Sequence, residues 1–122
     1  MKRTKFDAKK IKKNLDILWS KFIRARDKSC QKCGKTGATQ AAHIFSRNNL
    51  QVRWNPRNGI GLCFYCHLYW AHRSPVEFTL WIKQRIGERD FRELERTARG
   101  NFDSSKLRLK KEVEKIKEAI KL

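Results

Sequence analysis

The sequence is short of acidic residues. Twelve Asp and Glu stand against thirty Lys and Arg among 122 residues, which leaves a formal net charge of +18. Positive charge spread along the whole chain favours a polyanionic partner, and it fits a nucleic-acid backbone better than one anionic metabolite. A basic composition alone would also fit a ribosomal or membrane-surface protein, but the sequence contains no lipidation motif.

Long apolar runs, internal repeats and low-complexity segments are also absent. No stretch could cross a membrane or form the core of a signal peptide, so we expect no membrane partner and a cytoplasmic location. A chain of 122 residues is long enough for one domain but not comfortably for two. We expect a single domain over 1–122. Its apolar fraction is only 39%, so a bound metal would help to hold a small core together.

What the chain does have is two Cys-x-x-Cys pairs. Cys30 and Cys33 form the first pair and Cys63 and Cys66 the second, with 29 residues between them. Four cysteines could form two disulfides in a small secreted protein, but in a reducing cytoplasm the thiols stay free. Each pair can hold one side of a tetrahedral metal ion, so the spacing predicts a structural Zn²⁺ site. Buried or redox-active thiols are the alternative.

Helices are predicted at both ends of the chain. Apolar residues recur at steps of three and four between Ile11 and Ile23, which indicates a helix of about 18 residues whose apolar face covers the core. We assign 6–27 to this N-terminal helix, 28–73 to a central zinc-binding module and 74–122 to a C-terminal helical region.

The C-terminal region has its own helical periodicity and ends in an amphipathic segment. Its last helix is expected to begin at Asp103 or Ser104, and its apolar residues are spaced four, three and four apart. Such a face either packs back on the core or pairs with a second copy of the chain, so a homodimer through this helix is an open alternative.

The central module has the pattern of a hairpin followed by a helix. Residues 40–45 are short and apolar and residues 50–54 alternate, which predicts two antiparallel strands. A helix is expected from Phe64 to about Arg73. With the flanking helices, this pattern predicts an α+β fold.

This arrangement resembles the HNH endonucleases, also called the ββα-metal or His-Me finger group. The matching residues, in chain order, are Cys30, Cys33, His43, Asn58, Cys63, Cys66 and His67. Within the group, the NinG family of phage recombination nucleases, also called Rap, is the most similar, over roughly residues 22–98. The resemblance implies a zinc-stapled ββα-metal module that hydrolyses phosphodiester bonds, on branched or recombination-intermediate DNA, in a phage-infected or bacterial cell.

The resemblance also assigns catalytic roles. His43 matches the general base, because a neutral imidazole can take a proton from water near pH 7. Asn58 matches the residue that positions the loop and, through it, the base. His67 matches a ligand of one catalytic Mg²⁺ or Mn²⁺ ion. Each residue also has a structural alternative: a hairpin histidine, a turn asparagine, and a histidine that binds zinc or caps the helix.

Two positions depart from the family pattern. Ala42 and Ala71 stand where members of the group often have further metal ligands. His72 lies one residue late, and at 100° per residue it would point about 140° away from His67 unless the helix end is distorted. Because Mg²⁺ often binds through few protein ligands plus substrate phosphates, we expect a site that is completed on DNA. Gln40 or Asn58 could help to complete it.

DNA contacts are predicted at Arg47, Arg53 and Arg57, which bracket the hairpin, and along the lysine-rich first helix. Trp54 could stack on an unpaired base or wedge into a distorted duplex, or it could belong to the hairpin core. With contacts mainly to phosphates, sequence specificity should be low. The alternative functions are a general HNH nicking or packaging-associated nuclease, and a zinc-dependent DNA-binding protein without catalysis.

Overall fold

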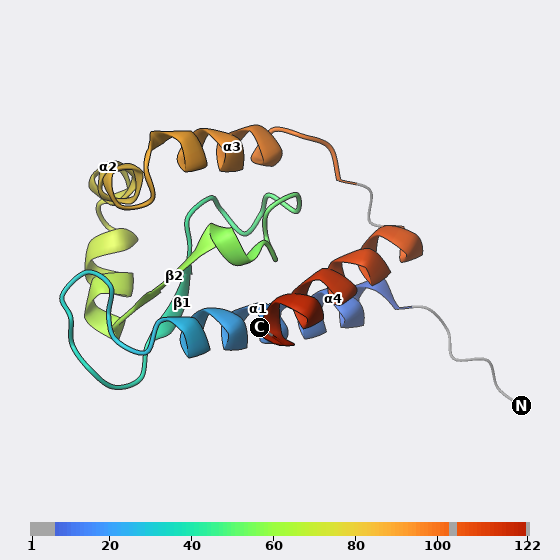
Figure 1. Cartoon of the computed structure of the whole chain (residues 1–122), viewed down its shortest axis with the longest axis horizontal. Helices are drawn as coiled ribbons and strands as arrows, with labels where there is room; N and C mark the ends of the chain where they lie inside the picture. The colour runs from blue at the N-terminus through green and yellow to red at the C-terminus, as the bar shows by residue number, and fades with distance from the viewer. Residues whose placement is uncertain (1–6, 103–104, 122) are drawn as a thin grey trace, which may run out of the picture.

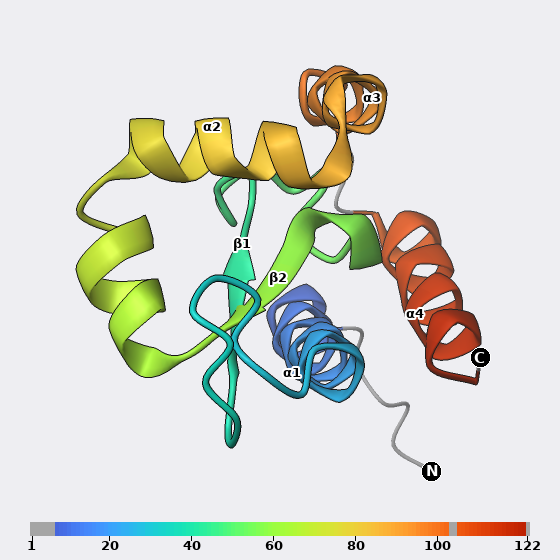
Figure 2. The ribbon, with the colours of Figure 1, turned by 60° about the vertical axis from the view of Figure 1, so that its left-hand side comes forward.

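The computed structural model describes residues 7–102 and 105–121. Their elements are α1 (Ala8–Arg26), β1 (Gln40–His43), η1 (Pro56–Asn58), β2 (Gly59–Leu62), η2 (Cys66–Ala71), α2 (Pro75–Ile86), α3 (Glu88–Ala98) and α4 (Lys106–Lys121). The predicted α+β class is confirmed for this part of the chain. In Figure 1 the two strands lie between α1 with α4 on one side and α2 with α3 on the other, and Figure 2 shows the same layers after a turn.

The N-terminal helix forms where the periodicity placed it. Asp7 caps α1 by accepting a hydrogen bond from the backbone N–H of Lys10 at 3.2 Å. Leu15, Trp19 and Ile23 are the buried residues of its apolar face. Within the described residues, no helix combines the length and the apolar character that a membrane span needs.

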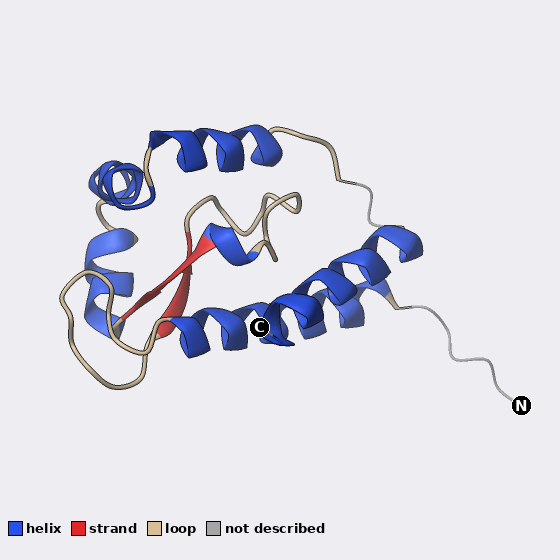
Figure 3. Ribbon diagram, viewed as in Figure 1, coloured by secondary structure: helices blue, strands red, loops and turns tan. Residues whose placement is uncertain are grey.

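The second strand is not where the sequence predicted it. β2, Gly59–Leu62, pairs antiparallel with β1, whereas residues 50–54 form turns (Figure 3). The apolar alternation in 50–54 has another cause. Val52 is buried against Leu94 and Ala98, while Trp54 belongs to a different apolar cluster beside α1. The turn places Val52 in one apolar cluster and Trp54 in another. Its apolar residues therefore alternate in the sequence as they would in a strand.

β2 has glycine on one face and large apolar residues on the other. Ile60 and Leu62 pack in the cluster that includes α2 and α3. Gly59 and Gly61 face the opposite way, and a Cβ added at Gly59 would lie only 2.5 Å from an atom of the Trp19 ring. The two glycines therefore let α1 lie directly on the sheet.

The last helix packs back on the core. α4 runs beside α1, and the two helices share one apolar cluster (Figures 1 and 2). The cluster consists of Leu15, Trp19, Ile23, Trp54, Leu109 and Ile116. This confirms the first alternative for the C-terminal helix. The predicted start of the helix at Asp103 or Ser104 lies outside the described residues.

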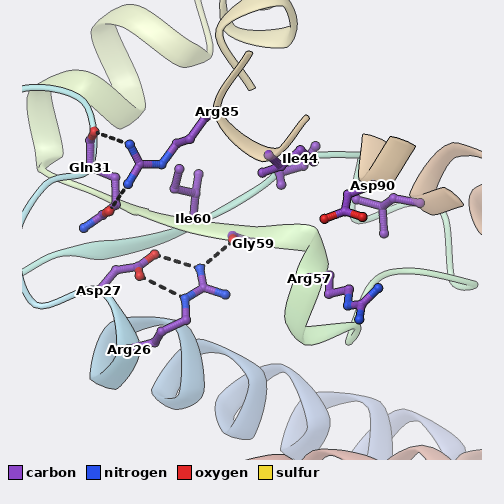
Figure 4. A pocket seen from close by; sticks show the side chains of 11 residues that line it. Arg26, Asp27, Gln31, Ile44, Arg57, Gly59, Ile60, Arg85 and Asp90 are labelled. Atoms are coloured by element: carbon purple, nitrogen blue, oxygen red, sulfur yellow. Dashed lines mark hydrogen bonds and ion pairs between the residues drawn. The ribbon is translucent and has the colours of Figure 1, made fainter. Parts of the chain in front are cut away.

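Charged side chains, rather than a third strand, hold the outer edge of β2. The carboxylate of Asp27 accepts hydrogen bonds from the backbone N–H of Gly61 at 2.8 Å and from the guanidinium of Arg26 at 2.9 and 2.7 Å. Arg26 also donates to the carbonyl of Gly59 at 2.8 Å (Figure 4). Burial alone would raise the pKa of Asp27, but these donors hold it below the ordinary value. The exposed strand edge is thereby satisfied.

We expect Asp27→Asn to lower the free energy of unfolding at pH 7 by about 1–3 kcal/mol, because a partly buried charged hydrogen-bond network loses its charge. A carboxyl whose pKa is lower in the folded state stabilises the fold above its unfolded pKa, and this contribution is lost as the pH falls through the folded pKa. The difference between wild type and variant should therefore shrink in acid. Denaturant titrations at neutral and acidic pH measure it.

The matched control is Glu114→Gln, which removes an exposed carboxylate from α4 and should change stability by less than about 0.5 kcal/mol. If Asp27→Asn and wild type unfold at the same denaturant concentration at pH 7, the edge of β2 does not depend on this carboxylate.

Candidate functional site

The four cysteines converge on one point. Their sulfur atoms all lie within 4.8 Å of one another, and the sulfurs of Cys33 and Cys63 are 3.8 Å apart. Four sulfurs at a Zn–S distance of about 2.3 Å in a tetrahedron stand about 3.8 Å from each other. Cys30, Cys63 and Cys66 are buried, and Cys33 is exposed. The predicted ligands are thus brought together as a cluster that can hold a zinc ion.

The local backbone supports thiolate at this cluster. The N–H of Cys33 points at the sulfur of Cys30 at 3.5 Å, and the N–H of Cys66 points at the sulfur of Cys63 at 3.4 Å. Burial alone would raise the pKa of Cys30, but N–H donors lower it to about 6. Burial and the neighbouring thiols raise the pKa of Cys66. A thiolate at one cysteine disfavours ionisation of its neighbours by electrostatic repulsion. A bound divalent cation would offset this repulsion.

His43 ends β1 with its imidazole fixed on two sides. The ring stacks on the indole of Trp19, with centroids 3.9 Å apart and planes 10° apart. Its Nε2 lies 2.9 Å from the carbonyl oxygen of Arg53. A carbonyl can only accept, so Nε2 carries the hydrogen and Nδ1 keeps its lone pair. Burial lowers the pKa of His43, so the ring is neutral near pH 7. Such an imidazole can accept a proton at Nδ1.

Asp16 on α1 holds the loop that supplies this carbonyl. Its carboxylate accepts from the guanidinium of Arg53 at 2.9 and 2.7 Å, from the indole N–H of Trp54 at 2.9 Å and from Arg47 at 3.3 Å. Burial alone would raise the pKa of Asp16, but these donors hold it below the ordinary value. Asp16 was not among the residues predicted from the sequence. It could have been found as the one acidic residue within α1.

Two of the predicted DNA contacts are instead internal. Trp54 is 2% exposed and belongs to the core, which confirms its structural alternative and rules out the stacking role. The side chain of Arg53 is 17% exposed and is bound to Asp16, so only a small part of it is available to DNA. Arg47 and Arg57 remain accessible, at 59% and 75% exposed.

Asn58 is fully buried and ties two ends of one loop together. Its amide oxygen accepts from the N–H of Phe45 at 2.7 Å, and its NH₂ group donates to the carbonyls of Phe45 and Val52, each at 3.0 Å. This loop continues into Arg53, whose carbonyl holds His43. Both N–H groups of the Asn58 side chain are used, and the residue is fully buried, so this side chain supports the loop.

His67 has one nitrogen engaged and one free. Its Nδ1 lies 2.8 Å from the amide oxygen of Gln40, and because that oxygen only accepts, Nδ1 carries the hydrogen. Nε2 therefore keeps a lone pair that can ligate a cation. Burial, and then the positive charges of His72 and His43, lower the pKa of His67. Gln40, predicted as a possible helper at the metal, instead orients the histidine.

The helix that carries His67 is distorted, as a shared ion would require. η2 is a π-helix, and the N–H of His72 donates to the carbonyl of His67, five residues back, at 3.1 Å. The two rings meet edge to face with centroids 4.7 Å apart. The sequence predicted that His72 points away from His67 unless the helix end is distorted, and this distortion is present. In a π-helix the fifth residue comes round to the first, as the fourth does in an α-helix.

A cavity of about 390 Å³ lies beside β2 and is separate from the histidines (Figure 4). Three guanidinium groups reach its walls. Arg26 is bound to Asp27, and Arg85 donates to the side chain of Gln31. Arg57 has only a distant acidic neighbour, at 3.9 Å. Arg57 is thus the guanidinium of this cavity with the weakest link to a neighbouring group.

Comparison with protein-family models, with curated proteins and with solved structures gave no significant match to this chain.

We expect one tightly held zinc ion per chain, and we expect Cys63→Ala to lose it and to unfold the central module. The physical reason is that, in a domain this small, metal-binding free energy is folding free energy. Metal analysis and near-ultraviolet circular dichroism provide the measurements. Cys33→His, which keeps a zinc-ligating side chain at the exposed corner, should retain the ion. A Cys63→Ala protein with a native spectrum and one zinc would contradict the assignment.

The ring of His43 should titrate below the ordinary histidine value of about 6.5, because burial disfavours the charged form. At pH 7.5 the proton of the neutral ring should sit on Nε2, since Arg53 accepts it there. Nitrogen-15 NMR of the ring distinguishes the two tautomers and follows the titration. A proton on Nδ1, or a midpoint at or above 6.5, would contradict the geometry.

Proposed function

We propose that this protein is a metal-dependent DNA endonuclease with an HNH-type centre. The observation that carries the proposal is the state of His43, a neutral imidazole with a free Nδ1 and with Nε2 held by the Arg53 carbonyl. His67 and His72 form a pair that a divalent cation can use, and His43 is close enough to His67 to influence it electrostatically. A general base beside a metal site is what hydrolysis of a phosphodiester requires.

In the proposed reaction His43 acts first. Its Nδ1 takes a proton from a water molecule placed in line with the scissile phosphate, and the Arg53 carbonyl stabilises the resulting imidazolium through the Nε2 proton. Trp19 prevents the ring from turning, and Asn58 keeps the supporting loop in register. The base therefore needs no rearrangement at the moment of reaction.

His67 and His72 are the residues that would hold Mg²⁺ or Mn²⁺. They fit such an ion because Gln40 fixes the hydrogen of His67 on Nδ1, which directs the Nε2 lone pair outward from that bond. The bound ion would polarise the phosphate and neutralise charge on the leaving oxygen. Water and substrate phosphates complete a shell with so few protein ligands.

The substrate we propose is DNA, bound mainly through its phosphates. The +18 formal charge and the accessible Arg47 and Arg57 support this partner. We propose branched or recombination-intermediate DNA as the preferred form. A second candidate is a DNA-binding protein that no longer cuts. Ala42 and Ala71, buried at 2% and 6% where related centres carry ligands, favour that candidate.

Cleavage of labelled linear, nicked, forked and four-way DNA with added magnesium or manganese tests the function. His43→Ala should reduce cleavage by about two to four orders of magnitude, the usual contribution of a positioned base. Zinc content and DNA affinity should stay near wild type. His67→Ala and His72→Ala should also lose activity, and higher manganese should restore part of it.

Gln84→Ala, on the exposed side of α2, is the matched control and should cut normally. His43→Asn, which preserves a planar polar side chain, separates loss of the base from loss of folding. If a folded His43 variant cuts at the wild-type rate, the proposed mechanism is wrong. If wild type binds every DNA but cuts none with either metal, the non-catalytic candidate replaces it.

A further inference from the structure

The exposed aromatic side chains of this protein gather in one place. Phe64, Tyr65 and Tyr69 are 55%, 67% and 46% exposed, and every other aromatic ring within the described ranges is buried or half-buried. Tyr65 and Tyr69 have ring centroids 5.5 Å apart with planes 31° apart, and Phe64 meets Tyr69 edge to face at 6.0 Å. We call these three residues the aromatic platform.

Basic side chains accompany the platform. The guanidinium of Arg73 lies 4.8 Å from the centroid of the Tyr69 ring. Lys32 and Lys35 line the adjoining cavity of about 530 Å³, and its lining contains no acidic residue. A zinc ion held by four thiolates would carry a net charge of about 2−, which these two lysines balance. Phosphates can therefore approach the platform without meeting uncompensated negative charge.

The aromatic platform and His67 lie on opposite sides of the same helical segment. Tyr65 and Tyr69 are each two residues from His67 along the helical segment, which is roughly half a turn. The two tyrosines and His67 therefore occupy opposite sides of one helix. A helix with its side chains is about 10 Å thick, so two DNA segments can contact the two sides at once.

We propose that the aromatic platform binds unpaired nucleotides of a DNA strand by stacking bases on Tyr65 and Tyr69. Every base has a π-face, so stacking on exposed rings holds a single strand without regard to sequence, and neighbouring cations track its phosphates. In duplex DNA the same faces are covered by neighbouring base pairs. The platform thus takes the stacking role predicted for Trp54, which is buried.

This inference deepens the proposed nuclease function, because it names a part of the substrate. A DNA with an unpaired arm can place that arm on the platform while a phosphodiester lies at His43 and His67 on the other side of η2. Binding by the platform requires neither the general base nor the catalytic metal. The two proposals can therefore fail separately.

The test compares binding of a labelled oligothymidylate of about 12 nucleotides with binding of a duplex of equal length, by fluorescence anisotropy near 0.15 M salt without magnesium or manganese. Wild type should prefer the single strand. The double variant Tyr65→Leu with Tyr69→Leu keeps the apolar surface but loses the rings, and it should bind the single strand at least about 25-fold more weakly, since each ring contributes about 5- to 150-fold.

Three controls isolate stacking. Tyr65→Phe with Tyr69→Phe keeps the π-faces and should bind the single strand like wild type. Leu80→Ala removes an exposed apolar side chain elsewhere, on α2, and should also have no effect. Zinc content verifies that the leucine variant is folded. Photo-crosslinking of an iodouracil-containing strand should label the peptide that carries Phe64, Tyr65 and Tyr69.

If the leucine variant binds the single strand as tightly as wild type, the platform proposal is overturned, whatever the His43 variants do. The same conclusion follows if wild type binds duplex more tightly than the single strand, and the platform would then be a surface for a protein partner. If no DNA is cut but the leucine variant loses single-strand binding, the nuclease proposal falls and the platform stands.

Discussion

The contact between α1 and the glycine face of the hairpin holds the candidate centre together. Gly59 leaves room for Trp19, and the same indole forms the surface on which His43 stacks. One turn earlier on the helix, Asp16 holds the loop whose Arg53 carbonyl accepts a hydrogen bond from Nε2–H of His43. A single helix thus determines both the orientation and the tautomer of the imidazole. A side chain at Gly59 would collide with Trp19 and Ile23, move α1 away and release both restraints.

The few carboxylates of this basic chain are placed where they organise arginines. Asp16 gathers Arg47 and Arg53, and Asp27 orders Arg26 along the edge of β2. Partial burial strengthens these pairs, since water screens them less. The guanidiniums left without a close carboxylate face the solvent, and a polyanion would meet them first. Asp16 therefore orders a loop and Asp27 orders the edge of β2, while arginines without a close carboxylate stay available to the proposed polyanion.

The π-helix that follows the second cysteine pair determines where the next side chains lie. The extra residue in its turn buries Ala71 against the core and brings His72 round to His67. The same short helix places Tyr65 and Tyr69 on its far side, next to the cysteine cluster. The histidine pair and the aromatic platform are thus separated only by the thickness of a helix. The four cysteines anchor the start of this segment, so the zinc that they can hold would stabilise both surfaces.

Periodicity and spacing in the sequence determined the helices at both ends, the position of β1 and the four-cysteine cluster. These features are local or follow from ligand chemistry, so residue order alone specifies them. Tertiary structure decided the rest. The second strand is Gly59–Leu62 because only packing against α1 distinguishes glycines that admit a helix from glycines that end a turn. Packing also buried Trp54 and assigned Asp16 its role. The π-turn that brings His72 next to His67 depends on the burial of Ala71 against the core. Such a contact between distant parts of the chain cannot be derived from α-helical periodicity.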